Sequence, residues 1–90
     1  AEGRTLLLDV QADILDGLNT RTVVPLLPVG TAPKPAARLN PLFEIDGVKL
    51  VMVTQFIAAV PATLLRERAG NLDSSHRAII DALDMLFVGY

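Results

Sequence analysis

The chain has 90 residues, a formal net charge of −2 and no cysteine, and 51% of its residues are hydrophobic. This balance lacks the basic excess of nucleic-acid-binding proteins, so we expect no direct nucleic-acid binding, and without cysteine there are no disulfides or thiolate metal sites. The single histidine, His76, excludes metal sites built from several histidines. A domain this small buries a limited share of its surface, so the apolar surplus predicts self-association as a homodimer.

Targeting signals are not evident in the sequence. No apolar run reaches the roughly 18 residues that a membrane span requires, and residues 1–4 show no signal peptide. We therefore expect a single domain over residues 1–90 that works in the reducing cytoplasm, away from membranes and without a cofactor.

Short aliphatic runs in the first third of the chain predict β-strands at residues 5–11 and 22–27, separated by a turn-rich loop. The second run is β-branched and contains Pro25. Because proline has no N–H to donate, we expect this strand to have an edge or a bulge at that residue.

The middle of the chain changes character. Four prolines within residues 28–41 predict an excursion loop instead of a regular element. Aliphatic runs at residues 42–45 and 48–54 then flank Asp46-Gly47. An Asp-Gly pair in this setting predicts a hairpin, because a type I′ turn needs positive φ at both central residues. Residues 55–65, which contain Val-Pro, predict an irregular, kinked strand.

Residues 74–87 have the period of an amphipathic helix. Asp73, Ser74 or Ser75 is expected to cap its first turn, and Gly89 to follow its end. Strands followed by one helix predict a mainly β, α+β fold, namely a small SH3-like barrel with an inserted proline-rich loop or hairpin and a C-terminal α-helix. The predicted apolar stripe of the helix consists of Leu72, Ile79, Ile80, Leu83, Leu86 and Phe87.

Residue types that carry catalysis are scattered along the chain. The carboxylates Asp9, Asp13 and Asp16 fall on a strand and in a loop, which favours polar-surface and turn roles. His76 falls in the first turn of the helix, where we expect it to be solvated. No second histidine or nearby lysine is placed to activate a serine or threonine. We therefore predict no catalytic residue and no metal site.

The C-terminal residues 86–90, Leu-Phe-Val-Gly-Tyr, form an apolar cluster where chains are usually polar. Two interpretations stay open. In one, Leu86 and Phe87 pack down and the last three residues fill a barrel mouth or a dimer seam. In the other, the helix presents its end to a partner, with Tyr90 as an aromatic anchor.

Several segments resemble one known family in order and spacing. Residues 9–15, Asp-Val-Gln-Ala-Asp-Ile-Leu, resemble the Asp-Val-Gln-Ser-Asp-Ile-Ile stretch of CcdB toxins. Residues 22–26, Ile-Asp-Gly at 45–47, Val-Pro at 60–61 and the stretch 72–90 follow in the family's order. On these motifs the chain is identified as a member of the CcdB family over essentially its whole length.

The resemblance implies an SH3-like barrel with a C-terminal helix, two copies of which form a dimer. It implies the toxin of a type II toxin–antitoxin system, which poisons DNA gyrase by binding its A subunit through the paired C-terminal ends and is not an enzyme. A disordered segment of a CcdA-like antitoxin removes such toxins. The partner-binding positions that the resemblance implies are Ala12, Ile14, Asp84, Val88, Gly89 and Tyr90.

The chain departs from the family pattern in three places. Val88 stands where the best-known member has tryptophan, and Asp84 where it has asparagine, while Tyr90 supplies an aromatic two positions after Val88. The family also has a strand ahead of residues 5–11. We expect the chain as given to lack that N-terminal piece, which would leave a strand edge without its neighbour.

Two alternatives remain open. The MazF/PemK endoribonucleases share this fold and place a catalytic threonine just after the Pro-Leu of the second strand, with an arginine nearby. This chain has Leu27 at that position, and its candidate cation, Arg21, has no predicted partner. The other alternative is a CcdB homologue that binds only its antitoxin and poisons nothing.

Overall fold

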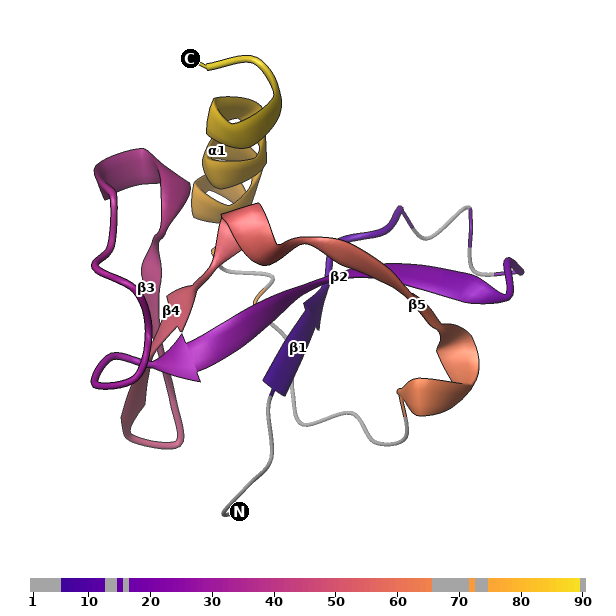
Figure 1. Cartoon of the computed structure of the whole chain (residues 1–90), viewed down its shortest axis with the longest axis horizontal. Coiled ribbons are helices and arrows are strands. Elements are labelled where there is room, and N and C mark those ends of the chain that lie inside the picture. Colours follow the sequence, from indigo (N-terminus) through magenta and orange to yellow (C-terminus); the bar gives the residue numbers. More distant parts are fainter. Residues whose placement is uncertain (1–5, 13–14, 16, 66–71, 73–74, 90) are drawn as a thin grey trace.

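The computed structural model describes residues 6–12, 15, 17–65, 72 and 75–89. Within them, one five-stranded antiparallel sheet curls into a half-barrel, and a single α-helix follows it at the C-terminal end of the chain (Figure 1). This strand-rich α+β architecture with a C-terminal helix confirms the predicted fold class. The elements are β1 (Leu6–Asp9), β2 (Thr20–Pro28), β3 (Leu42–Ile45), β4 (Val48–Met52), β5 (Ala58–Pro61) and α1 (His76–Phe87).

The long strand β2 organises the sheet. On one side it pairs with β1, and on the other its C-terminal part pairs with β4 and its N-terminal part with β5. Leu26 pairs with Met52 and Val23 pairs with Ala58. The chain advances three residues on β2 between these pairs but six residues on the segment opposite, from β4 to β5. The three surplus residues form the 3-10 turn η3 (Thr54–Phe56). This turn separates β4 from β5 and lets the sheet bend.

Pro25 lies opposite this break. Its carbonyl oxygen accepts a hydrogen bond from the Val53 N–H at 3.0 Å. The N–H and C=O groups of a strand residue point to the same side of the strand. Proline has no N–H, and at Pro25 this missing donor would point toward the break between β4 and β5, where no regular strand pairing requires it. The predicted break in regular strand pairing at Pro25 is therefore present. The extra residues that produce it belong to the segment between β4 and β5 and not to β2.

The hairpin between β3 and β4 is confirmed. Ile45 pairs with Val48, and the two residues between them have positive φ, 51° at Asp46 and 79° at Gly47. Both signs are those of a type I′ turn. The kinked fifth strand is also confirmed, since β5 is only four residues long and is flanked by η3 and by the 3-10 turn η4 (Ala62–Leu64).

Several predicted bounds were wrong by a few residues. β1 ends at Asp9 instead of residue 11. The Val10 N–H still donates to the Thr22 carbonyl on β2, but the Thr22 N–H bonds to the side chain of Gln11 instead of a backbone carbonyl. β2 begins at Thr20 and extends to Pro28. The proline-rich loop contains a 3-10 turn, η2 (Ala37–Leu39).

The core lies between the sheet and α1, which also contacts η2 and η3. The predicted apolar stripe of the helix was wrong at two positions, because Ile80 is 39% exposed and Phe87 is 70% exposed. Successive residues turn by about 100° around a helix, and the buried face is centred nearer Ala82, which is fully buried. The buried residues of the core are Val24, Leu26, Leu50, Met52 and Ala82, with Leu72, Ile79 and Leu83 packed against them.

The start of the helix differs slightly from the prediction. α1 begins at His76, which is exposed as expected, and Ser75 occupies the N-cap without a capping hydrogen bond from its side chain. The other proposed caps, Asp73 and Ser74, lie outside the described residues. No helix in the described ranges has the length and apolar character that crossing a bilayer requires.

Candidate functional site

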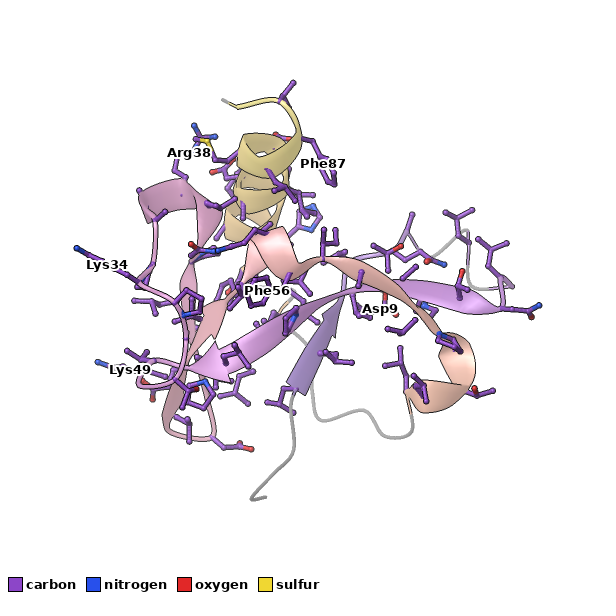
Figure 2. The ribbon with its side chains drawn as sticks, viewed as in Figure 1. Asp9, Lys34, Arg38, Lys49, Phe56 and Phe87 are labelled. Atoms are coloured by element: carbon purple, nitrogen blue, oxygen red, sulfur yellow. The ribbon has the colours of Figure 1, made fainter. Side chains whose placement is uncertain are left out.

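The last turn of α1 carries exposed apolar side chains. Phe87, at the end of α1 in Figure 2, is 70% exposed. Val88 is 58% exposed, and Asp84, one turn before it, is also exposed. Leu86 is half-buried. The interpretation in which Phe87 packs down onto its own chain is therefore wrong, because its helix position lies on the side that faces away from Ala82.

Gly89 ends the helix through its backbone conformation. Its N–H reaches the carbonyl oxygens of Asp84 at 3.1 Å and Met85 at 3.2 Å, and its φ is +79°. A glycine with positive φ directly after a helix satisfies carbonyls that would otherwise lack donors. The predicted C-terminal stop is confirmed.

A second exposed segment follows β1. Ala12 is exposed, and its carbonyl accepts the Leu15 N–H at 2.9 Å. Leu15 is 44% exposed and Leu18 is 51% exposed. Leu15 and Leu18 therefore offer exposed aliphatic surface in the segment after β1.

Side-chain hydrogen bonds of Gln11 connect Leu15 to β2. The Gln11 amide nitrogen donates to the Leu15 oxygen at 3.0 Å, and the Gln11 amide oxygen accepts the Thr22 N–H at 3.0 Å. The sequence pattern placed Gln11 at the end of the predicted strand 5–11 and predicted no role for its side chain. A place at the end of a strand does not reveal what the side chain reaches.

The prediction that Arg21 has no partner was wrong. Its Nε lies 2.7 Å from Oδ2 of Asp9, and its side chain is only 13% exposed. Asp9 faces Val23 across β1 and β2, so Arg21 is its diagonal neighbour on that strand. The other carboxylate oxygen of Asp9 accepts the Gln11 N–H at 3.0 Å. The Asp9 carboxylate therefore bonds to both Arg21 and Gln11.

The family model described as CcdB protein matches residues 1–89 of the chain. The chain belongs to the CcdB family. It is accordingly a toxin of the toxin–antitoxin class, and its fold is a strand-rich half-barrel with a C-terminal helix.

The CcdB positions implied by the sequence fall into two separate groups within one chain. Asp84, Val88 and Gly89 lie together at the end of α1, whereas Ala12 lies in the loop between β1 and β2, away from the helix end (Figure 1). Ile14 and Tyr90 lie outside the described residues. The structure therefore provides two candidate contact segments, which one copy of the chain does not bring together.

The geometry also bears on the endoribonuclease alternative within the CcdB-like folds. Leu27, at the position of the catalytic threonine, is half-buried in β2 opposite Val51. Arg21, the candidate cation, contacts Asp9, whose negative charge opposes the binding of a phosphate beside it. Neither observation favours RNA cleavage.

The surface of α1 also carries a small hollow of about 210 Å³, lined by His76, Arg77 and Ile80. Small-molecule sites usually measure about 300–1,000 Å³ and are enclosed. This hollow is therefore a poor small-molecule site, and the exposed apolar segments of this CcdB-family protein suit contact with a macromolecule better.

Proposed function

We propose that this chain is a CcdB-type gyrase poison, which acts by binding the A subunit of DNA gyrase and not by catalysis. The observation that supports this most directly is the exposure of Phe87 and Val88 beside the Gly89 stop. Apolar and aromatic side chains that become fully buried supply most of the free energy at protein interfaces. A helix packed on a core holds such side chains in a defined position, which lowers the entropic cost of binding.

The departure from tryptophan at position 88 is consistent with this proposal when Phe87 is considered. Val88 offers less area than an aromatic side chain, but Phe87, one residue earlier, is more exposed still. Aromatic side chains bury about 150–250 Å² each when they are covered. We propose that Phe87 and Val88 together, with Tyr90, form the apolar contact at the helix end, where the best-known member of the family has a tryptophan at the position of Val88.

The proposal includes a homodimer. Leu72, Ile79 and Leu83 are occupied by packing against their own core, whereas Ile80 and Phe87 remain exposed on the other side of α1. Two copies that meet through the part of this side around Ile80 bury apolar area there, leave Phe87 exposed for gyrase and bring their C-terminal ends close to the two-fold axis. Gyrase would then be bound by the paired ends of two helices.

The remaining partner is a CcdA-like antitoxin in the cytoplasm. Membership of the CcdB family supports this assignment. We propose that an extended antitoxin segment covers the exposed apolar surface and thereby competes with gyrase. The antitoxin itself is to be sought among proteins that bind this chain with high affinity and restore supercoiling in its presence.

The proposal is tested with a pull-down and a supercoiling assay, using the purified A subunit and reconstituted gyrase. The intact chain is compared with a version cut before Val88 and with Val88→Ser. Val48→Ser is the matched control, because Val48 is 50% exposed but lies on the β3–β4 hairpin. We expect the intact chain and the control to bind and inhibit gyrase, and the other two variants to lose binding by tenfold or more, as an estimate from contact residues.

Failure of the intact chain to bind the A subunit would contradict the proposal. An RNA-cleavage assay would then test the endoribonuclease alternative. High-affinity antitoxin binding without gyrase binding or RNA cleavage would instead identify a CcdB homologue that has kept only its antitoxin.

A further inference from the structure

Asp84 lies on the outer face of α1, on the side of the helix that faces away from the core. Successive helix residues turn by about 100°, so Asp84 lies about 160° around the helix from the buried Ala82. Ile80 precedes Asp84 by about one turn and Phe87 follows it by about one turn, and all three residues are exposed. The carboxylate is therefore flanked along the exposed face by apolar side chains.

No group of the described chain neutralises this carboxylate. Among the described residues, the Asp84 side chain forms no ion pair and no hydrogen bond. The described last turn of α1 contains no basic residue, and Arg77, the basic residue on the same face, lies about two turns earlier at the start of the helix. The charge of Asp84 is therefore available to a partner.

The position of this charge is unfavourable for the helix itself. The carbonyl groups of the last turn give the C-terminal end of a helix a partial negative charge, which repels a carboxylate. Asp84 belongs to that end, since its carbonyl accepts the N–H groups of Val88 at 2.8 Å and Gly89 at 3.1 Å. Residues that oppose the local structure are expected mainly at functional sites. An interaction with a partner therefore explains Asp84 better than folding does.

We propose that Asp84 forms an ion pair with a lysine or arginine of the gyrase A subunit, beside the apolar contact of Phe87 and Val88. This inference rests on the proposed function, in which the end of α1 binds that subunit. Covering Phe87 and Val88 removes water from the neighbouring carboxylate, and a carboxylate that loses water without gaining a cation weakens binding. Asp84 is thus a specificity-determining residue, which favours an A subunit with a basic side chain at this place and disfavours one without it.

Two substitutions separate the charge of Asp84 from its shape. Asp84→Asn keeps the size of the side chain and removes the charge, which gives the residue of the best-known family member. Asp84→Lys reverses the charge. Both changes relieve the conflict with the helix dipole, so neither should lower the melting temperature.

Asp46→Asn is the matched control. It removes the same charge at an exposed position, but on the turn between β3 and β4, at the opposite end of the molecule from the end of α1 (Figure 1). Asparagine tolerates the positive φ of 51° at this position, so the turn stays intact. Net charge alone would affect Asp46→Asn and Asp84→Asn equally, and equal losses of binding in the two would overturn the inference.

The experiment measures the association rate and the dissociation constant for the purified gyrase A subunit, at roughly 0.05 M and 0.5 M salt. At the lower salt we expect Asp84→Asn to weaken binding about tenfold, Asp84→Lys to weaken it by about tenfold more, and both to associate more slowly. Asp46→Asn should change binding by no more than about twofold. At the higher salt, the association rates of the wild type and Asp84→Asn should converge, because salt screens the attraction. A purely structural role of Asp84 would change the melting temperature and leave this salt dependence unchanged.

The outcomes distinguish the inference from the proposed function. If the wild type binds the A subunit and Asp84→Asn binds equally well or more tightly, the ion pair is wrong and the proposed function stands. If both Asp84 variants weaken binding to the same extent without a change in salt dependence, Asp84 contributes shape instead of charge, and the inference is again overturned. If the wild type does not bind, the gyrase assignment itself is wrong, and the ion pair is overturned with it.

Discussion

The side-chain nitrogen of Asn40 donates a hydrogen bond to the main-chain oxygen of Met52 at 3.1 Å, across the seam between the proline-rich loop and β4. Asn40 is only 4% exposed, and both polar atoms of its side chain are hydrogen-bonded. Its nitrogen also donates to the Gln55 side-chain oxygen at 2.8 Å, and its oxygen accepts the Ala36 N–H at 3.0 Å. Asn40 thereby attaches the proline-rich loop to β4. This loop contains η2, which contacts α1.

We therefore predict that Asn40→Asp lowers the free energy of unfolding by about 3 kcal/mol. The substitution keeps the shape of the side chain but removes both donors and places a carboxylate beside the Met52 oxygen. Urea denaturation followed by circular dichroism measures the change. Thr31→Ala, which removes a hydroxyl bond at an exposed position of the same loop, should cost no more than about 0.5 kcal/mol. Equal losses in the two variants would show that Asn40 is not the attachment point.

Gly89→Ala should destabilise the C-terminal end of α1. The backbone there has a φ of +79°, and no atom lies within 4 Å of an added Cβ, so the cost comes from the backbone conformation alone. That cost is about 1–2 kcal/mol for a residue with a Cβ. Thermal unfolding measures it, and Gly89→Asn should cost less because asparagine tolerates this region better. Gly30→Ala is the control, since Gly30 has no positive φ, and a normal melt for Gly89→Ala would mean that Gly89 does not set the helix end.

The features that could be predicted from the sequence are those determined by residues that are close together along the chain. The Asp46-Gly47 turn and the Gly89 stop were predicted correctly, because each depends on the local φ preference of one or two residues. The helix face was predicted less well. Large apolar residues such as Phe87 dominate a periodicity pattern, whereas the residue of the helix that is fully buried in the core is the small Ala82.

The candidate site was predicted mostly by resemblance and only in part by pattern. The Arg21–Asp9 pair was missed because it depends on the register of β1 against β2, which is set by contacts over the whole sheet. The role of Gln11 was missed for the same reason, since its acceptor bond is to a strand eleven positions away. Exposure of the helix end is likewise a tertiary property that the sequence does not contain locally.

Asp84→Asn should stabilise the protein slightly. Asp84 lies in the last turn of α1, where the partial negative charge of the helix dipole opposes a carboxylate, and the described last turn carries no basic residue. Removing the charge is worth about 0.3–1 kcal/mol at low salt and less at high salt. Chemical denaturation at two ionic strengths measures both values. Asp81→Asn, in the middle of the helix, should show a smaller gain, and a loss of stability in Asp84→Asn would contradict the dipole argument.

Phe87 and Phe43 provide a matched pair that separates binding from folding. Phe43 packs against the core, so Phe43→Ala should cost about 3 kcal/mol of unfolding free energy. Phe87 is 70% exposed in one chain, so at a concentration where the protein is monomeric, Phe87→Ala should change that free energy by no more than about 0.5 kcal/mol. Association should respond differently from folding. Phe87→Ala should weaken dimerisation, measured by sedimentation equilibrium, or the affinity for the gyrase A subunit about tenfold or more, because an aromatic contact is lost. If Phe87→Ala changes neither association while remaining folded, the outer side of α1 is not an interface, and the proposed gyrase contact must lie elsewhere on the chain.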